Sequence, residues 1–486
     1  MSNYHNICLL NDAFPPIIDG VANAVYNYGR CIEQNHGHSV VVTPEVPGSD
    51  DSIYDFTVVR YPSIDTRKMM GYVTGYPFSP EAAHRIEEEH VELMHTHCPV
   101  MSAVLAKDLA EAMHVPLVLT WHTKYDIDIA NMIRSRMLQE GAIRALMVNV
   151  NACDEVWAVS RGAGENLKSL GYEGDVLVMP NGVDLPHEPV SQSLIDEVTS
   201  GYDLPADVPV FLFTGRMMWY KGLRIILDAL DMLRAEGTDF RMVFVGGGGD
   251  EEEVREYTAE LGLNGSVIFA GPVYDRELLR AWYSRADLFL FPSTFDTNGL
   301  VVREAAASDT ASVIIADSCA SEGVTDGRNG FLIEENAEAL AAKLREVLAD
   351  PEIMKTVGEG AGRELYISWD DAVAHAYDRY EIVLDNYKRG VYGSHDLLRG
   401  SLNQSRGEMM QLLGDFDAAR KSMTDAAETR YTEIEQAMRS HQNRIMTDII
   451  TAGYETRQDV INFTDELVNR VQEAADNILD AFDRYL

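Results

Sequence analysis

Short apolar segments rich in valine, isoleucine and leucine alternate along this chain with longer amphipathic segments. Such apolar runs are typical of parallel strands buried on both faces, and the segments between them are typical of covering helices. The pattern predicts an α/β protein with strands at 7–10, 39–43, 93–95, 116–120 and 155–159, and again at 208–213, 241–245, 266–269, 288–291 and 312–315. Each half of the chain is therefore expected to form its own doubly wound sheet.

The length of the chain predicts two domains and an appendage. It has 486 residues, more than one hydrophobic core usually organises, and its 46% hydrophobic composition is sufficient for two. Proline, glycine and asparagine gather at 180–190, which indicates an interdomain connection. We expect an N-terminal domain over 1–185, a second domain over 186–370, a helix returning to the first domain over 371–395 and a helical extension over 396–486. Ligands of such sheets collect at the carboxyl ends of strands, so the domains are expected to face each other across a cleft.

Charge and cysteine content exclude several classes of function. The formal net charge of −38, from 78 acidic and 40 basic side chains, would repel nucleic acid at long range. The five cysteines are scattered without C-x-x-C spacing, as in a reducing compartment, and form no recognisable zinc motif. The N-terminus resembles no signal peptide, and no segment is apolar enough to span a membrane. These features predict a cytoplasmic protein that does not bind nucleic acid.

From about residue 402 onward, apolar residues recur at helical spacing. This stripe predicts one or two long amphipathic helices, joined near Gly453. A stripe of that length must be buried against the body of the protein, a second copy or a lipid surface. Its polar face mixes charges of both signs, which favours packing on protein, including homo-oligomerisation, over a membrane role.

Two segments of the second half carry charged residues suited to a nucleotide sugar. GRMMWYKG contains Arg216 and Lys221 after an expected strand, and FPSTFDTNGLVVREAAA places Asp296 and Glu304 eight positions apart. Two cations can hold a diphosphate by its charge, and a carboxylate behind a glycine turn can hold ribose hydroxyls. Taken singly, Arg216 and Lys221 could also be solvated surface cations, and Glu304 could be an ordinary helix residue. Together the segments predict a nucleotide-sugar site.

The first half offers further candidates near the ends of its expected strands. Gly20 follows the first strand, where the lack of a side chain would let a ligand approach the backbone, although an ordinary turn fits it equally. His122 follows the strand at 116–120, and His95 and His97 lie at the end of the strand at 93–95. Each histidine fits a site role or a structural role. The glycine run at 245–253 lacks the spacing of a dinucleotide or P-loop motif and is expected only to face a nucleotide.

Over roughly residues 5–388, the chain resembles the family 4 retaining glycosyltransferases, which have the GT-B fold of two Rossmann-like domains. Seven stretches follow the family's motifs in order, namely FPPIIDGVANAV, HTHCP, WHTKYD, VSRGAGENLKSLG, MPNGVD, GRMMWYKG and FPSTFDTNGLVVREA. The resemblance implies a hexosyltransferase that moves a sugar from UDP-glucose or a similar nucleotide sugar to an acceptor hydroxyl. It also implies retention at the anomeric carbon, by front-face attack with the leaving phosphate accepting the acceptor's proton.

The resemblance also implies roles for single residues. Arg216 and Lys221 would hold the donor diphosphate and neutralise charge on the leaving group. Glu304 would bind the ribose hydroxyls. Gly20 would let the backbone approach the donor phosphates, and His122 would lie near the reacting sugar carbon.

The remaining donor contacts fall in the turn before Glu304. By the resemblance, Asp296 would contact hydroxyls of the transferred sugar, and the N–H groups of Asn298, Gly299 and Leu300 would help to hold sugar and phosphate. The family usually carries glutamate where this chain has Asp296, which is one methylene shorter. The contact of Asp296 is therefore less well defined than that of Glu304.

We expect no metal and no cofactor other than the nucleotide-sugar cosubstrate. Asp126 and Asp128 form a D-x-D pair like that of metal-dependent glycosyltransferases of another fold, but such pairs arise by chance in an acidic chain. By the resemblance, Arg216 and Lys221 would neutralise the charge of the diphosphate, as a metal ion does in other enzymes.

The acceptor is less well specified than the donor. FPP followed by DGV, the histidine motifs and DTNG resemble most the branch that glucosylates diacylglycerol, whose members dock on membranes. This implies a lipid or glycolipid acceptor and peripheral contact with the inner membrane face. The segment 130–147 has Arg134, Arg136 and Arg144 but only a moderate apolar face, so an ordinary helix beside the cleft fits it equally. A saccharide acceptor, an epimerase or phosphorylase on the same fold, and a non-catalytic helical scaffold are the alternatives.

Overall fold

The computed structural model describes residues 4–392 apart from 18, 65, 67–72, 78, 133 and 134. This part of the chain contains two parallel sheets and a small antiparallel pair of β4 (Ser63–Ile64) with β5 (Thr74–Gly75). The predicted pair of doubly wound sheets is therefore confirmed. The predicted helical extension at 396–486 lies outside the described residues.

The first sheet has the strand order β3-β2-β1-β6-β7-β8-β9, with all neighbours parallel. Its strands are β1 (Asn6–Leu10), β2 (His38–Pro44), β3 (Thr57–Tyr61), β6 (Leu93–Thr96), β7 (Leu117–Trp121), β8 (Glu155–Ala158) and β9 (Val176–Val178). Side chains alternate between two cores, so that Cys8 and Leu10 join one and Ile7 and Leu9 the other. Both faces are buried, which explains the continuous apolar runs in the sequence.

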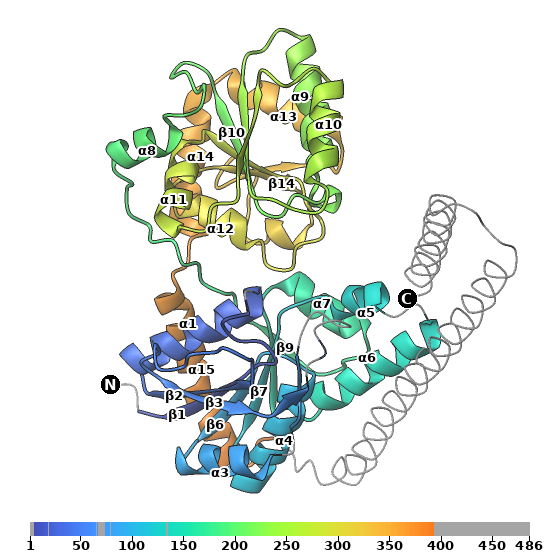
Figure 1. The fold of residues 1–486 in the computed structure, drawn as a ribbon, viewed down its shortest axis with the longest axis vertical. Helices are drawn as coiled ribbons and strands as arrows, with labels where there is room; N and C mark the ends of the chain where they lie inside the picture. Colours follow the sequence, from blue (N-terminus) through green and yellow to red (C-terminus); the bar gives the residue numbers. More distant parts are fainter. Residues whose placement is uncertain are drawn as a thin grey trace, which may run out of the picture. The chain divides into compact units, whose positions relative to one another are not determined.

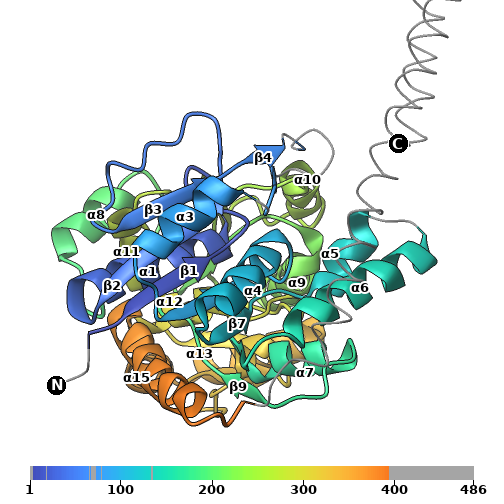
Figure 2. The same ribbon diagram turned by 90° about the horizontal axis from the view of Figure 1, so that it is seen from below.

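Helices cover both faces of this sheet. The core that contains Cys8 also contains residues of α3 (Pro80–Glu88), α4 (Met101–Met113), α6 (Arg136–Val150) and α7 (Arg161–Ser169). The core that contains Ile7 includes residues of α1 (Gly20–Asn35) and α15 (Trp369–Lys388). A short helix, α5 (Tyr125–Met132), packs beside α6 (Figure 2).

Helix α15 follows the second sheet in the chain but belongs to the core of the first. Trp369, Tyr377 and Tyr380 are buried in the same cluster as β1 and α1, and in Figure 1 the orange α15 lies among the blue elements. The Tyr380 hydroxyl is 2.6 Å from Nδ1 of His95. The C-terminal helix of the described chain thus supports the strand end where the predicted histidines lie.

The second sheet has the parallel strand order β12-β11-β10-β13-β14-β15. Its strands are β10 (Val210–Thr214), β11 (Arg241–Val245), β12 (Val267–Gly271), β13 (Leu288–Phe291), β14 (Ser312–Ile315) and β15 (Phe331–Ile333). Its helices are α8 (Gln192–Thr199), α9 (Leu223–Ala235), α10 (Glu251–Glu260), α11 (Arg276–Arg285), α12 (Leu300–Ala306), α13 (Ala337–Leu348) and α14 (Pro351–Glu364). The order reverses between β10 and β13, the point at which open α/β sheets bind ligands.

All ten predicted strands are present, with ends that differ by no more than two residues. The prediction missed β3, β9 and β15 of the two parallel sheets, and the two-residue strands β4 and β5. β3 carries the charged Arg60, β9 is an exposed edge strand, and β15 has only three residues, so none gives a clear apolar run. The segment 130–147, considered as one basic helix, is divided between α5 and α6, and α6 begins after its N-cap residue Ser135.

Replacing a buried aromatic residue of α15 is expected to destabilise the first domain. Tyr380→Ala leaves a cavity against the sheet and removes the partner of His95, and should lower the free energy of unfolding by about 3–5 kcal/mol. Ile382→Ala on the same helix, where 46% of the residue is exposed, should change it by about 0.5 kcal/mol or less. Chemical denaturation followed by circular dichroism measures both. Equal effects would contradict the placement of α15.

Candidate active site

The predicted charged residues of the second half meet where its strand order reverses. The loop after β10 carries Arg216 and Lys221, and the loop after β13 carries Asp296. Because β10 and β13 pair directly, their carboxyl ends are adjacent. The fold therefore joins residues that are far apart in the sequence.

Lys221 and Asp296 form an ion pair. Lys221 Nζ lies 2.8 Å from Asp296 Oδ2, and the two side chains are 15% and 22% exposed. Burial alone would raise the pKa of Asp296, but the charge and hydrogen bond of Lys221, together with the N–H groups of Gly299 and Asn298, lower it overall. Asp296 is thus held as a carboxylate beside a fixed ammonium group.

Arg216 differs from Lys221 in its surroundings. It is exposed, and it makes no hydrogen bond or ion pair with any other residue in the described part of the chain. Its guanidinium group is therefore available to an anionic ligand without breaking a contact within the protein.

Gly222 permits the close approach of these two loops. It has φ +80°, and a Cβ atom placed on it would lie 1.9 Å from the carbonyl oxygen of Pro292 in the loop after β13. Any side chain would therefore push the loops apart and strain the backbone.

Glu304 lies on α12 beside this pair and has two partners of its own. Arg276 Nη2 donates to Oε1 at 2.9 Å, and the Tyr283 hydroxyl donates to Oε2 at 3.0 Å. Burial raises the pKa of Glu304, and these two partners offset only part of that effect. Sequence reasoning missed Arg276 and Tyr283, because neither lies in a recognisable motif.

Asp296 stabilises the turn that leads from it to Glu304. Asp296 Oδ1 accepts the N–H of Gly299 at 3.1 Å, and Leu300 begins α12. Asn298 is only 7% exposed, and neither polar atom of its side chain has a hydrogen-bond partner among the described residues. A buried amide without partners is unusual, which makes the side chain of Asn298, and not only its N–H group, a candidate for ligand contact.

Contacts between the two halves of the chain adjoin this turn. The Ser160 hydroxyl at the start of α7 donates to the carbonyl oxygen of Thr297 at 2.6 Å. Glu322 accepts the N–H groups of Arg161 and Gly162, at 2.7 and 2.6 Å. The first turn of α7 is therefore bound directly to the segment that carries Asp296.

His122 belongs to a group of buried histidines at the carboxyl ends of β6 and β7. Its Nε2 lies 2.9 Å from His97 Nδ1, while the buried Nε2 of His97 has no hydrogen-bond partner in the part of the chain that the structure describes. His95 contacts Tyr380 and Thr120. Burial lowers the pKa of His122 to about 3, and burial with the neighbouring rings lowers the pKa of His95 and His97 well below the usual range. All three rings are neutral at physiological pH.

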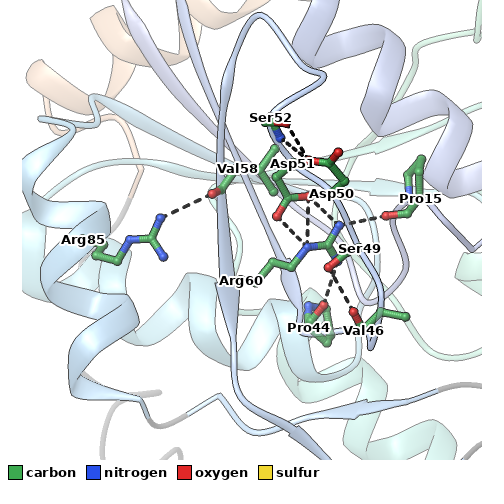
Figure 3. Close-up of polar contacts among 10 residues, drawn as sticks. All are labelled: Pro15, Pro44, Val46, Ser49, Asp50, Asp51, Ser52, Val58, Arg60 and Arg85. Carbon is green, nitrogen blue, oxygen red and sulfur yellow. Dashed lines mark hydrogen bonds and ion pairs between the residues drawn. The ribbon is translucent and has the colours of Figure 1, made fainter.

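Gly20 is the first residue of α1, and no atom of the described residues, its chain neighbours aside, lies within 4 Å of a Cβ placed there. Asp19 caps the helix by accepting the N–H groups of Val21 and Ala22, each at 2.7 Å. The preceding loop is anchored by Arg60, which donates to the carbonyl oxygen of Pro15 at 2.8 Å (Figure 3). Pro15 is thus held in place, and none of the described residues fills the space beside Gly20.

The D-x-D pair lies in the first turn of α5. Asp126 Oδ1 accepts a hydrogen bond from Asn166 at 3.0 Å. Burial and the charge of Asp126 raise the pKa of Asp128, and Arg216 offsets part of this effect. One acid of the pair is therefore engaged within the protein.

Family comparisons agree with this arrangement. Residues 18–186 match the model of "Glycosyltransferase Family 4", and residues 196–363 match "Glycosyl transferases group 1". The chain is 32% identical to a D-inositol 3-phosphate glycosyltransferase of Xylanimonas cellulosilytica, over 61% of this chain and 73% of that protein. It is 21% identical to an alpha-monoglucosyldiacylglycerol synthase of Streptococcus pneumoniae, over 71% of this chain and 79% of that protein.

The fold also matches solved structures. Anabaena HepE, crystallised with UDP and glucose, aligns with a TM-score of 0.60 at 19% identity, covering 78% of this chain and all of that one. Two doubly wound sheets with a cationic loop and an acidic loop at the reversal point define a GT-B glycosyltransferase. The chain belongs to the family 4 glycosyltransferases and transfers a sugar to an acceptor.

Among the described residues, no helix has the length and apolar character needed to cross a membrane.

Gly222→Ala tests the approach of the two loops. Gly237 has a similar φ of +84° but open space around it, so Gly237→Ala should cost only the backbone strain of about 1–2 kcal/mol. Gly222→Ala should cost more, because it adds the collision with Pro292. Chemical denaturation of both variants isolates the steric part, and equal losses would show that the loops are not in contact.

The buried histidines predict a loss of stability in acid. Their rings stay neutral in the folded chain, whereas they take up protons below about pH 6.5 when unfolded. Stability should therefore fall as the pH drops from about 6.5 toward 3, by up to about 1.4 kcal/mol per pH unit for each ring. His97→Phe should reduce this slope, because it removes one of the three buried rings. Denaturant titrations from pH 7.5 to 5 measure the slope.

Proposed function

We propose that this glycosyltransferase is a retaining hexosyltransferase that uses a UDP-sugar, with UDP-glucose as the first candidate. The observation that carries the proposal is the pairing of Lys221 with Asp296 beside the unpaired Arg216, at the strand ends where such sheets bind nucleotides. UDP is favoured because the structurally similar HepE was crystallised with UDP and glucose.

Each residue of this group has a part in the proposed transfer. Arg216 and Lys221 hold the diphosphate and stabilise the negative charge that grows on it. Asp296 contacts hydroxyls of the sugar, with Asn298, Gly299 and Leu300 beside it, and Glu304 holds the ribose. Gly20 leaves room for the donor phosphates.

The proposed reaction exchanges one bond for another at the anomeric carbon. The bond from that carbon to the diphosphate oxygen breaks, a bond to the acceptor oxygen forms on the same face, and the acceptor proton passes to the leaving phosphate. His122 is neutral, with a pKa of about 3, so it can donate or accept a hydrogen bond to the sugar but cannot supply a proton at neutral pH.

No metal takes part in the proposed reaction, because the two cations neutralise the diphosphate. Transfer should therefore persist after chelation with EDTA, with the rate unchanged on adding Mg²⁺ or Mn²⁺. Loss of transfer on chelation that is restored by either metal would contradict this proposal.

For the acceptor, we propose a diacylglycerol-type lipid or glycolipid, reached from the cytoplasmic face of the membrane. The similarity to an alpha-monoglucosyldiacylglycerol synthase supports this choice. Helix α6 exposes Arg136, Leu138 and Arg144, a surface suited to anionic lipid, although Arg136 is also paired with Glu140 at 3.2 Å. The similarity to D-inositol 3-phosphate glycosyltransferases supports a phosphorylated polyol as the second candidate.

Substitutions distinguish the residues of this site from charged residues that take no part in the transfer. Lys221→Met and Glu304→Gln should each lower kcat/KM for the nucleotide sugar by about 100-fold or more, because each removes a contact to the donor. Lys355→Met, which removes an exposed lysine of α14, should leave the rate unchanged. The readout is product mass spectrometry with diacylglycerol vesicles, a glycolipid, inositol phosphate and a saccharide as acceptors. Full activity of either site variant would refute the assignment.

A further inference from the structure

The carboxylate of Glu304 is held at both oxygens by other side chains. Arg276 binds Oε1 at 2.9 Å and Tyr283 binds Oε2 at 3.0 Å, and the glutamate side chain is 12% exposed. Each carboxylate oxygen can accept about two hydrogen bonds. Each oxygen of Glu304 therefore keeps one position for a hydroxyl group, and the two positions are fixed relative to each other.

Tyr283 connects this carboxylate to the end of β10. Burial and the charge of Glu304 raise the pKa of Tyr283 well above its usual value, so its hydroxyl stays protonated and donates to Glu304. The hydroxyl of Thr214 is hydrogen-bonded to the Tyr283 oxygen. Thr214 ends β10, two residues before Arg216, so one oxygen of Glu304 is positioned from the strand that carries the cationic loop.

Arg276 connects the other oxygen to the linker between the domains. It is the first residue of α11, and it also lies 3.4 Å from Oδ2 of Asp184. Asp184 in turn accepts hydrogen bonds from Asn23 and Asn27 of α1, at 2.9 and 3.0 Å. The guanidinium group is thus held between two carboxylates, one of which is anchored to the helix that begins at Gly20.

The planar guanidinium group also fixes an orientation that a point charge would not. Its donors lie in one plane and at set angles, so a bond to Oε1 restricts rotation of the Glu304 carboxylate. Without it, Glu304 would keep only the Tyr283 bond and would be free to turn about it. A turned carboxylate would no longer present both oxygens to a pair of adjacent hydroxyls.

We propose that Arg276 is a positioning residue that orients Glu304 toward the two ribose hydroxyls of the nucleotide, and that Asp184 secures Arg276 in that position. This inference rests on the proposed function, in which Glu304 holds the ribose. It adds that selection of ribose over deoxyribose depends on Arg276, a residue outside every motif of the sequence.

Calorimetric titration of the full-length protein with UDP and with 2′-deoxy-UDP tests the proposal. The wild-type protein should bind UDP more tightly by about tenfold or more, as expected for a hydrogen bond to a charged group. Arg276→Met should bring the two affinities close together, chiefly by weakening UDP. Arg276→Lys keeps the charge without the planar fork and should recover only part of the preference.

The matched control is Arg255→Met. Arg255 also pairs with one carboxylate, Glu251 at 2.8 Å, but it lies on α10 and has no contact with Glu304. This variant should keep the wild-type preference. General destabilisation would weaken both nucleotides alike and leave their ratio unchanged, so the ratio reports orientation and not folding.

The outcomes distinguish a failure of the role proposed for Arg276 from a failure of the proposed function. If the wild-type protein bound neither nucleotide, or bound both equally, the proposed ribose site itself would be refuted. If the wild type preferred UDP and both Arg276 variants kept the full preference, the ribose site would stand and the role of Arg276 would be refuted.

Discussion

The parallel pairing of β10 with β13 brings together two loops whose ion-paired residues, Lys221 and Asp296, are 75 positions apart in the chain. Both strands are fully buried, so their carboxyl ends are fixed by the packing of the whole second core. Gly222 then allows the loops to touch. The sheet therefore fixes where the charged residues lie, and hydrogen bonds from neighbouring residues then orient the carboxylates of Asp296 and Glu304.

A different constraint organises the first domain, where several polar side chains are buried at strand ends. His95, His97 and His122 are each less than a tenth exposed, and burial keeps their rings neutral. Their hydrogen bonds to one another, to Thr120 and to Tyr380 offset part of the cost of burial. Tyr380 comes from α15, the last described helix. Its hydroxyl contacts His95, which lies 285 positions earlier in the chain.

The ten main strands could be predicted from the sequence, and so could the placement of Lys221 and Asp296 after buried strands and of Glu304 on the following helix, because buried parallel strands and strand-end loops have local signatures. The sequence did not allow the partners of Glu304 to be predicted. Arg276 lies 28 positions and Tyr283 21 positions from Glu304, on another helix, and their contacts depend on how α11 packs beside α12. The bond between His97 and His122 was missed for the same reason, since it joins neighbouring strands. The roles assigned by resemblance, and the extension at 396–486, are not tested by the fold.

The distribution of charge shows how a strongly acidic chain would receive the anionic donor proposed for it. With a net charge of −38, attraction must come from a few local cations. Lys221 is ion-paired with Asp296, and Arg276 lies between the carboxylates of Glu304 and Asp184, so Arg276 and its two partners add no net positive charge. Arg216 is exposed and has no ion pair among the described residues, although its charge also acts on Asp128. In the proposed function, the exposed guanidinium group of Arg216 would attract the diphosphate, and the ammonium group of Lys221, held by Asp296, would orient it.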